Sequence, residues 1–165
     1  MKEQINHIER LKTISDIFIV MSVILLFLTF TSCSITPEPE PSAINKAEIT
    51  ATINEARQTE SIPPVTWDAI MQSAAEMQSA HMAETGWYEH TWEDGTSLLT
   101  RMNSLGFRGN AAENIAWNFD SQQRVIEAWM GSECHRYNIM NPKFTDFGMS
   151  RTGNSWCFVI GKEMK

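Results

Sequence analysis

Apolar side chains recur at helical spacing along much of the chain. Ile49, Ile53 and Ala56 predict a helix over residues 43–57, ending near Gln58, because prolines that cannot donate a backbone hydrogen bond follow it. A longer pattern predicts a second helix over residues 67–85, before Gly86. Its inward positions are Trp67, Ile70, Met71, Ala74, Met77, His81 and Met82.

Two shorter helices are predicted further along. The first contains Leu98, Leu99, Met102 and Leu105, with Asp94 or Thr96 as its cap. The second opens at Asp120, has Gln123 in the capping-box position, and turns Val125, Ile126, Trp129 and Met130 inward.

The end of the chain changes character. FTDFGMSRT and SWCFVIG are short, rich in β-forming residues and separated by Gly153 and Asn154, so they predict an antiparallel hairpin. Helices combined with antiparallel strands predict an α+β layered domain.

An uncharged apolar run from Ile17 to Phe30 precedes these elements. It is shorter than the about 20 residues of a spanning helix and suits the core of a signal peptide. It closes with Phe30-Thr31-Ser32-Cys33, which resembles a bacterial lipobox. Residues 1–33 are therefore predicted to be a signal peptide with Cys33 as the lipidation site; the alternative is an uncleaved membrane anchor. Both interpretations place the domain outside the cytoplasm.

Residues 34–45 are predicted to be a linker between the membrane anchor and the domain. Three prolines in this segment alternate with Glu38 and Glu40, which favours an extended, self-repelling chain. The folded domain then occupies residues 46–165. We expect it in the cell envelope, anchored to a membrane through its lipid, or secreted.

Length and charge narrow the function further. A chain of 165 residues is long enough for one domain with a core. Its net charge is -7 at pH 7, and no stripe of Lys or Arg is present. Because a net anion repels phosphates, nucleic acid is excluded as a partner.

Two of the histidines in the predicted domain are typical of a site. His90 lies in the loop HTWEDG, where no apolar periodicity demands an imidazole. His135 follows a helix end, in a polar turn with Arg136 and Asn138. His81 falls on the inward stripe of the long helix, so a hydrogen-bonded core histidine is predicted there.

Glu113 places a carboxylate inside the apolar stretch AAENIAW. A buried carboxylate needs a partner or a raised pKa. A functional group and a structural carboxylate that holds loop amides are equally favoured. Asn114 beside it is expected to pin the loop.

These residues belong to an ordered series of motifs. The series runs Ile53-Asn54 with Arg57, Pro64-Val65-Thr66-Trp67-Asp68, Ala74-Ala75 with His81 and Met82, His90 with Asp94-Gly95, Arg101 with Gly106-Phe107, Glu113-Asn114-Ile115-Ala116, Trp129-Met130-Gly131-Ser132 with His135-Arg136, Asn138-Ile139-Met140, and Phe144 with Gly148. From Ala47 to Gly161 the chain therefore resembles the bacterial branch of the CAP superfamily, also called SCP or cysteine-rich secretory, antigen 5 and pathogenesis-related proteins.

The resemblance implies a three-layer α-β-α sandwich with a surface cleft. In the family, two histidines and acidic residues face each other there, and the matching positions are His90, Glu113 and His135. Ser132 stands where many eukaryotic relatives have a glutamate, so the tetrad is incomplete. With Asn114, these residues form the predicted binding cleft.

Two neutral imidazoles and a carboxylate are a ligand set for zinc or another divalent metal with an open water position. His90 and His135 are the predicted metal ligands, and Glu113 would position or deprotonate the water. The spacing lacks the HExxH helix geometry, so a cleft without metal stays open as the alternative.

Cys134 departs from the common bacterial turn Ser-Pro-Gly-His-Arg, where glycine precedes the histidine. In an oxidising envelope we expect a disulfide between Cys134 and Cys157 that stabilises the fold by about 2–4 kcal/mol. A Cys134 nucleophile with His135 as its base is disfavoured because adjacent side chains diverge.

Three functions follow from these residues. The leading hypothesis is a lipoprotein that binds an extracytoplasmic lipid, glycan or partner protein through the cleft. The alternative is a divalent-metal-dependent, peptidase-like hydrolase with His90, Glu113 and His135 as catalytic candidates. The third is a structural hydrogen-bonded network, with recognition elsewhere on the surface. Trp67 and Trp129 are predicted in the core, and Trp87, Trp92 and Trp117 as ligand contacts.

Overall fold

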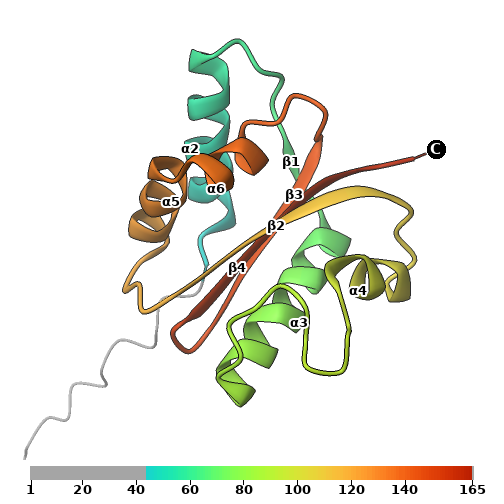
Figure 1. The fold of residues 1–165 in the computed structure, drawn as a ribbon. Helices are drawn as coiled ribbons and strands as arrows, with labels where there is room; N and C mark the ends of the chain where they lie inside the picture. The colour runs from blue at the N-terminus through green and yellow to red at the C-terminus, as the bar shows by residue number, and fades with distance from the viewer. Residues whose placement is uncertain (1–43, 165) are drawn as a thin grey trace, which may run out of the picture. The chain divides into compact units, whose positions relative to one another are not determined.

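Four strands form one sheet in residues 44–164, the part of the chain that this computed structural model describes (Figure 1). They are β1 (Thr66–Trp67), β2 (Gly109–Trp117), β3 (Asp146–Thr152) and β4 (Ser155–Glu163). The order is β1-β3-β4-β2, with β1 parallel to β3 and β4 antiparallel to both of its neighbours. The strand β2 is therefore an edge strand.

Helices cover both faces of this sheet. They are α2 (Lys46–Thr59), α3 (Ala69–Thr85), α4 (Leu98–Ser104), α5 (Gln122–Gly131) and α6 (Glu133–Ile139). Figure 1 shows α2, α5 and α6 on one face and α3 and α4 on the other. Each face has its own buried cluster, around Trp129 and Phe158 on the first and around Met71 and Val159 on the second. This arrangement confirms the predicted α+β, three-layer α-β-α sandwich.

The four predicted helices are present, and their starts differ from the prediction. Ser97 caps α4 and Ser121 caps α5, each through a side-chain oxygen that accepts from a backbone amide in the first turn. A serine directly before the first helical residue reaches that amide. Trp67 lies in β1 rather than in the long helix, because the Asp68 side chain caps α3 at Ala69.

The predicted hairpin is confirmed as β3 and β4, joined at Gly153 and Asn154, with Gly153 at a φ of 56°. The sequence patterns did not identify β2 or α6. β2 is buried from Glu113 to Ala116 without alternation, and a single residue, Ser132, separates α6 from the end of α5.

Close packing of α3 on the sheet depends on Gly148 in β3. A Cβ atom at this position would lie 2.1 Å from the backbone nitrogen of Gln72 in α3. Any larger residue would therefore push the helix from the sheet. The absence of a side chain keeps α3 and the loop that follows it in register with the strands.

A buried guanidinium fixes the segment that follows α6. Arg57 of α2 is fully buried and donates hydrogen bonds to the carbonyl oxygens of Pro63, Ile139, Asn141 and Phe144. Because the four acceptors belong to the segment before β1 and to the end of α6 and the segment after it, Arg57 holds α2, α6 and the approach to β3 together.

The predicted membrane attachment falls outside this domain. Within residues 44–164, every helix is too short or too polar to cross a bilayer. The predicted signal peptide over residues 1–33, its Cys33, and residues 34–43 of the predicted linker lie outside the described residues.

Candidate functional site

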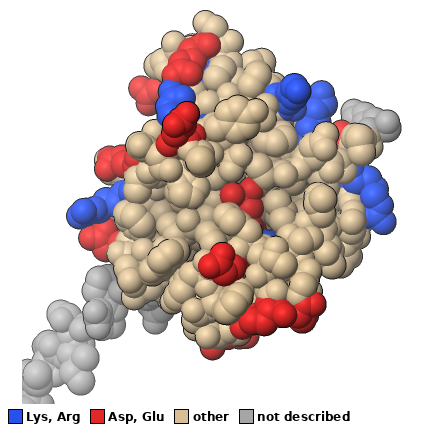
Figure 2. Space-filling view, in the orientation of Figure 1, with Lys and Arg blue, Asp and Glu red and all other residues tan. Residues whose placement is uncertain are grey.

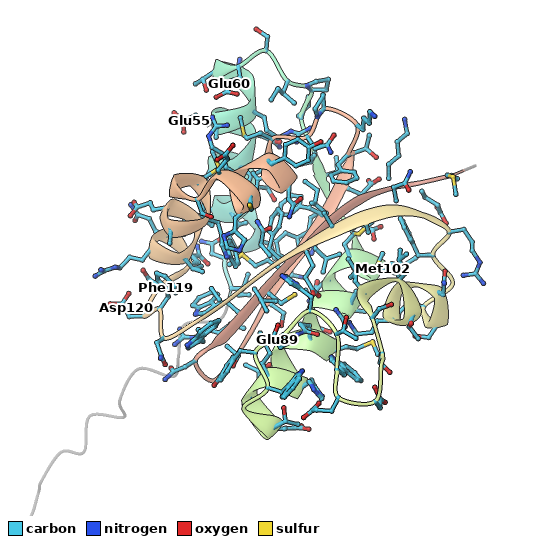
Figure 3. The ribbon with its side chains drawn as sticks, viewed as in Figure 1. Glu55, Glu60, Glu89, Met102, Phe119 and Asp120 are labelled. Carbon is cyan, nitrogen blue, oxygen red and sulfur yellow. The ribbon has the colours of Figure 1, made fainter. Side chains whose placement is uncertain are left out.

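The three predicted site residues come from three different elements. His90 lies in the loop between α3 and α4, Glu113 in β2 and His135 in α6. In Figure 3, Glu89 marks the loop that carries His90, and Phe119 marks the segment beyond the end of β2. His135 was predicted in a turn; it lies inside α6, so its backbone is helical.

Glu113 is the centre of a buried polar cluster. Its side chain is 2% exposed, and its Oε2 pairs with the guanidinium of Arg101, which is fully buried in α4. The Oε1 atom lies 3.0 Å from Nδ1 of His90, and the Cys157 thiol donates to Oε2 at 3.5 Å. Glu113 therefore binds side chains rather than loop amides, and its structural interpretation as a holder of loop amides is wrong.

Arg101 is a site residue that the sequence prediction missed. The sequence analysis named Arg101 only as part of a family motif. Its neighbours Leu98, Met102 and Leu105 nevertheless indicate that this face of the helix points inward. A cation on an inward helical face demands a buried acceptor. This requirement could have predicted from the sequence that Arg101 pairs with a buried carboxylate such as Glu113.

Side chains of α3 and α4 hold the loop that carries His90 in place. The Trp92 indole donates to Gln78 at 2.8 Å, and Gln78 donates to the carbonyl oxygen of Glu89 at 2.9 Å. His81 stacks on Trp92 with ring centroids 4.2 Å apart. Trp92, predicted as a ligand contact, is thus engaged in positioning the loop.

His81 is hydrogen-bonded, as predicted, through its Nε2 atom 2.9 Å from Glu93. The prediction that it belongs to the core is wrong, since its side chain is 16% exposed and its partner is on the surface.

The remaining residues of the predicted cleft, Asn114, Ser132 and His135, meet at α6. The amide of Asn114 donates to the carbonyl oxygen of His135 at 3.0 Å and accepts from Asn138 at 2.8 Å. Nδ1 of His135 lies 3.0 Å from the Ser132 hydroxyl. Asn114 therefore fastens β2 to the helix that carries His135, which extends the pinning role predicted for it.

The two imidazoles have opposite electrostatic environments. The hydrogen bond to Glu113 raises the pKa of His90, although burial opposes this. Burial lowers the pKa of His135, and the nearby charge of His90 lowers it further.

A pocket of about 280 Å³ opens beside this cluster, between the end of β2 and the helices α5 and α6. Its walls are apolar except for Ser132 and His135, which lie at one side. The lining residues are Ile115, Ala116, Trp117, Phe119, Ala128, Trp129, Ser132 and His135.

Exposed aromatic rings lie at the end of β2 and in the loop before His90. Trp117 is 45% exposed and stacks on Tyr88 with centroids 4.7 Å apart. Trp87 is also exposed. Trp129 lies in the core, as predicted, and Trp67 is only partly buried against it. Trp117 and Trp87 therefore keep their predicted role as candidate ligand contacts.

The cleft supplies fewer metal ligands than the sequence prediction required. Among residues 44–164, no three His, Cys, Asp or Glu side chains are grouped so that they could hold a metal ion. Glu113 is paired with Arg101, which leaves the two imidazoles, and a zinc site needs at least three protein ligands. The residues as arranged do not fit the predicted zinc site, so no chemical step is assigned to a metal.

The predicted disulfide is wrong, because both cysteines are free. Cys134 is exposed on α6, whereas Cys157 is fully buried in β4 beneath the sheet face that carries Glu113. A bond would require their sulfur atoms to meet across the sheet. Burial raises the pKa of the Cys157 thiol well above its usual range, with the charge of Glu113 adding to the effect.

The sequence profile of the Cysteine-rich secretory protein family, CAP, matches residues 50–159. The chain belongs to this family, which confirms the resemblance seen in its motifs. The chain is 31% identical over 121 residues to the uncharacterized protein YkwD of Bacillus subtilis (strain 168), a match that covers 70% of this chain and 47% of YkwD.

A second relative is the uncharacterized membrane protein YlbC of the same bacterium, which is 29% identical over 98 residues, or 58% of this chain and 28% of YlbC. The chain thus spans about half or less of the length of these relatives.

Solved structures share the fold. An extracellular protein containing a SCP domain from Bacillus anthracis str. Ames matches with a TM-score of 0.67 and 24% identity, over 72% of this chain and 40% of that one. An outer surface protein from Borrelia burgdorferi matches with a TM-score of 0.62 and 22% identity, over 72% of this chain and 92% of that one. At these identities the likeness concerns the fold alone.

We predict that His90 and His135 titrate on opposite sides of about pH 6.5, the ordinary histidine pKa. His90 holds its proton more tightly when folded, so its contribution to stability is present below about pH 6.5 and is lost as the pH rises through its folded pKa. His135 contributes stability above about pH 6.5, which is lost as the pH falls through its folded pKa. Ring NMR titration of the full chain, assigned with His90→Asn and His135→Asn variants, measures both. Equal midpoints, or the reverse order, would contradict the site geometry.

Proposed function

We propose that this chain is an exported, lipid-anchored CAP-domain protein that binds an extracytoplasmic ligand through the cleft between His90 and His135. The observation that carries the proposal is the apolar pocket of about 280 Å³ beside a hydrogen-bonding side formed by Ser132 and His135. Pockets of this kind take an apolar group of a ligand and fix its orientation with a few polar contacts.

The location outside the cytoplasm has two kinds of support. The apolar run before Cys33 suits a signal peptide, and Cys33 ends a lipobox-like sequence. The solved structures with this fold include an extracellular protein and an outer surface protein. The ligand is a lipid, a glycan or a partner protein, and the membrane is reached through the lipid on Cys33.

No contact among the described residues favours the alternative, a hydrolase that depends on zinc or another divalent metal. A general base would have to be free to take a proton from water, whereas Glu113 accepts bonds from Arg101 and His90 on its two oxygens. The hydrolase stays a prediction that the ligand experiment below also tests.

Anchoring is tested by replacing Cys33. We expect wild-type chain expressed in a bacterial host to fractionate with membranes and to begin at a diacylglycerol-modified Cys33, because thioether lipidation requires the thiol. Cys33→Ser should abolish the lipid mass, whereas Cys134→Ser should leave it intact. Wild-type chain that keeps residues 1–33 and carries no lipid would contradict lipidation and identify the uncleaved anchor.

Ligand binding is tested with three probes on the full chain: decanoate, an N-acetylglucosamine tetramer, and a pool of random heptapeptides. We expect at least one probe to bind by calorimetry or saturation-transfer NMR. Because Trp117 and His135 line the pocket, Trp117→Ala and His135→Ala should weaken that binding about tenfold or more, which corresponds to about 1.4 kcal/mol.

The matched control is Tyr137→Ala, which removes a ring that is 71% exposed on the same helix as His135 and does not line the pocket. It should leave binding unchanged. Failure of all three probes, or binding unaffected by both pocket variants, would overturn the proposal. Cleavage of a probe that a chelator abolishes would identify the metal-dependent hydrolase instead.

A further inference from the structure

The free edge of β2 carries outward-facing backbone groups into the cleft. Along two antiparallel strands, directly opposed residues alternate between two states. In one pair the backbone N–H and C=O groups bond to the neighbouring strand; in the next pair they point away from it. At the two ends of β2, the Arg108 carbonyl accepts from Met164 and the Asn118 amide donates to Asn154. Both are even-numbered, so the even-numbered residues of β2 bond to β4. The odd-numbered residues turn their N–H and C=O groups outward.

These outward groups are only partly satisfied. The carbonyl oxygen of Glu113 accepts from Asn138 at 3.4 Å, and that of Ile115 accepts from Trp129 at 3.3 Å. Within residues 44–164, the amides of Glu113 and Ile115 donate to no side chain or loop carbonyl. A backbone amide without an acceptor is costly, and a strand edge that pairs with no neighbouring strand is a template for another strand.

The spacing of these groups selects the ligand. Outward amides recur every second residue, which is about 6.8 Å along a strand. Another extended polypeptide repeats donors and acceptors at this interval, whereas an acyl chain has none and a sugar chain does not repeat them in this order. The edge therefore matches a peptide backbone.

The two walls of the cleft differ in chemistry. On the α5 and α6 side, the pocket that begins at Ile115 is apolar. On the other side, Glu89, Glu93 and Asp94 of the loop are exposed, whereas Arg101 of α4 is buried and paired with Glu113. The loop with Glu89 lies in the lower part of the view in Figure 3, and Figure 2 shows acidic side chains gathered in that part of the face. Successive side chains of an added strand would meet these two walls alternately.

We propose that the β2 edge binds an extended peptide segment of a partner protein as an additional strand. An apolar side chain of that segment fills the pocket lined by Trp117, and its neighbour, a basic side chain, lies over Glu89 and the ring of Tyr88. This inference rests on the proposed function, that the cleft binds a ligand, and adds the class of that ligand.

The test uses alternate backbone methylation. Binders are selected from acetylated and amidated random heptapeptides on the immobilised full chain. The best binder is then made in two forms, N-methylated at its odd or at its even residues. Only one set of peptide amides faces β2, so one form should bind at least about tenfold more weakly and the other within about twofold of the parent. Exchange of the Glu113 and Ile115 amides with solvent should slow when the parent peptide binds.

Two results would overturn the inference. If decanoate or the sugar tetramer binds in the cleft and no heptapeptide does, the ligand is not a peptide, while the proposed function stands. If both methylated forms bind alike, or exchange at Glu113 and Ile115 is unchanged, the peptide does not pair with β2. Failure of every probe would overturn both this inference and the proposed function.

Discussion

The buried ion pair between Arg101 and Glu113 is the contact on which the cleft depends. Both side chains are almost fully removed from water, so each charge relies on the other. The pair joins α4 to the edge strand β2, and the second oxygen of Glu113 reaches His90. Removing one partner of such a pair costs about 3–5 kcal/mol, because the remaining charge stays buried without compensation.

This pair positions groups at some expense in stability. The Nε atom of Arg101 is buried without a partner in the described residues. A buried donor left without an acceptor costs about 1–3 kcal/mol. A core optimised for stability alone would fill this space with apolar side chains, so the cluster is better explained by what it holds in place, namely His90 and its loop.

Two adjacent residues of β2, Glu113 and Asn114, hold the two elements that carry the histidines. Side chains alternate across a sheet, so Glu113 points to the layer of α3 and α4 while Asn114 points to that of α5 and α6. Glu113 holds the loop of His90, and Asn114 holds the backbone of His135. The structural network predicted as an alternative to binding is therefore present. It places the two histidines on either side of the exposed β2 edge, which is compatible with recognition there.

Local patterns of the sequence predicted the amphipathic helices and the final hairpin, because their periodicity and turn residues are local. The resemblance to the CAP family predicted the layered fold and brought His90, Glu113 and His135 together. β2 escaped prediction because it is buried on both faces and does not alternate. Arg101 escaped because its partner lies 12 residues away on another element, and the Cys134–Cys157 disulfide failed because sequence does not report which side of a sheet a cysteine faces.

The most direct test of this account is a double-mutant cycle on Arg101→Met and Glu113→Met, measured by urea unfolding of the full chain and by the ring NMR of His90. The account predicts that each single variant loses about 3–5 kcal/mol and that the double variant loses less than the sum by at least about 2 kcal/mol. It also predicts that the pKa of His90 falls whenever Glu113 is replaced. Additive losses, with the pKa of His90 unchanged, would show that the pair does not hold the cleft together.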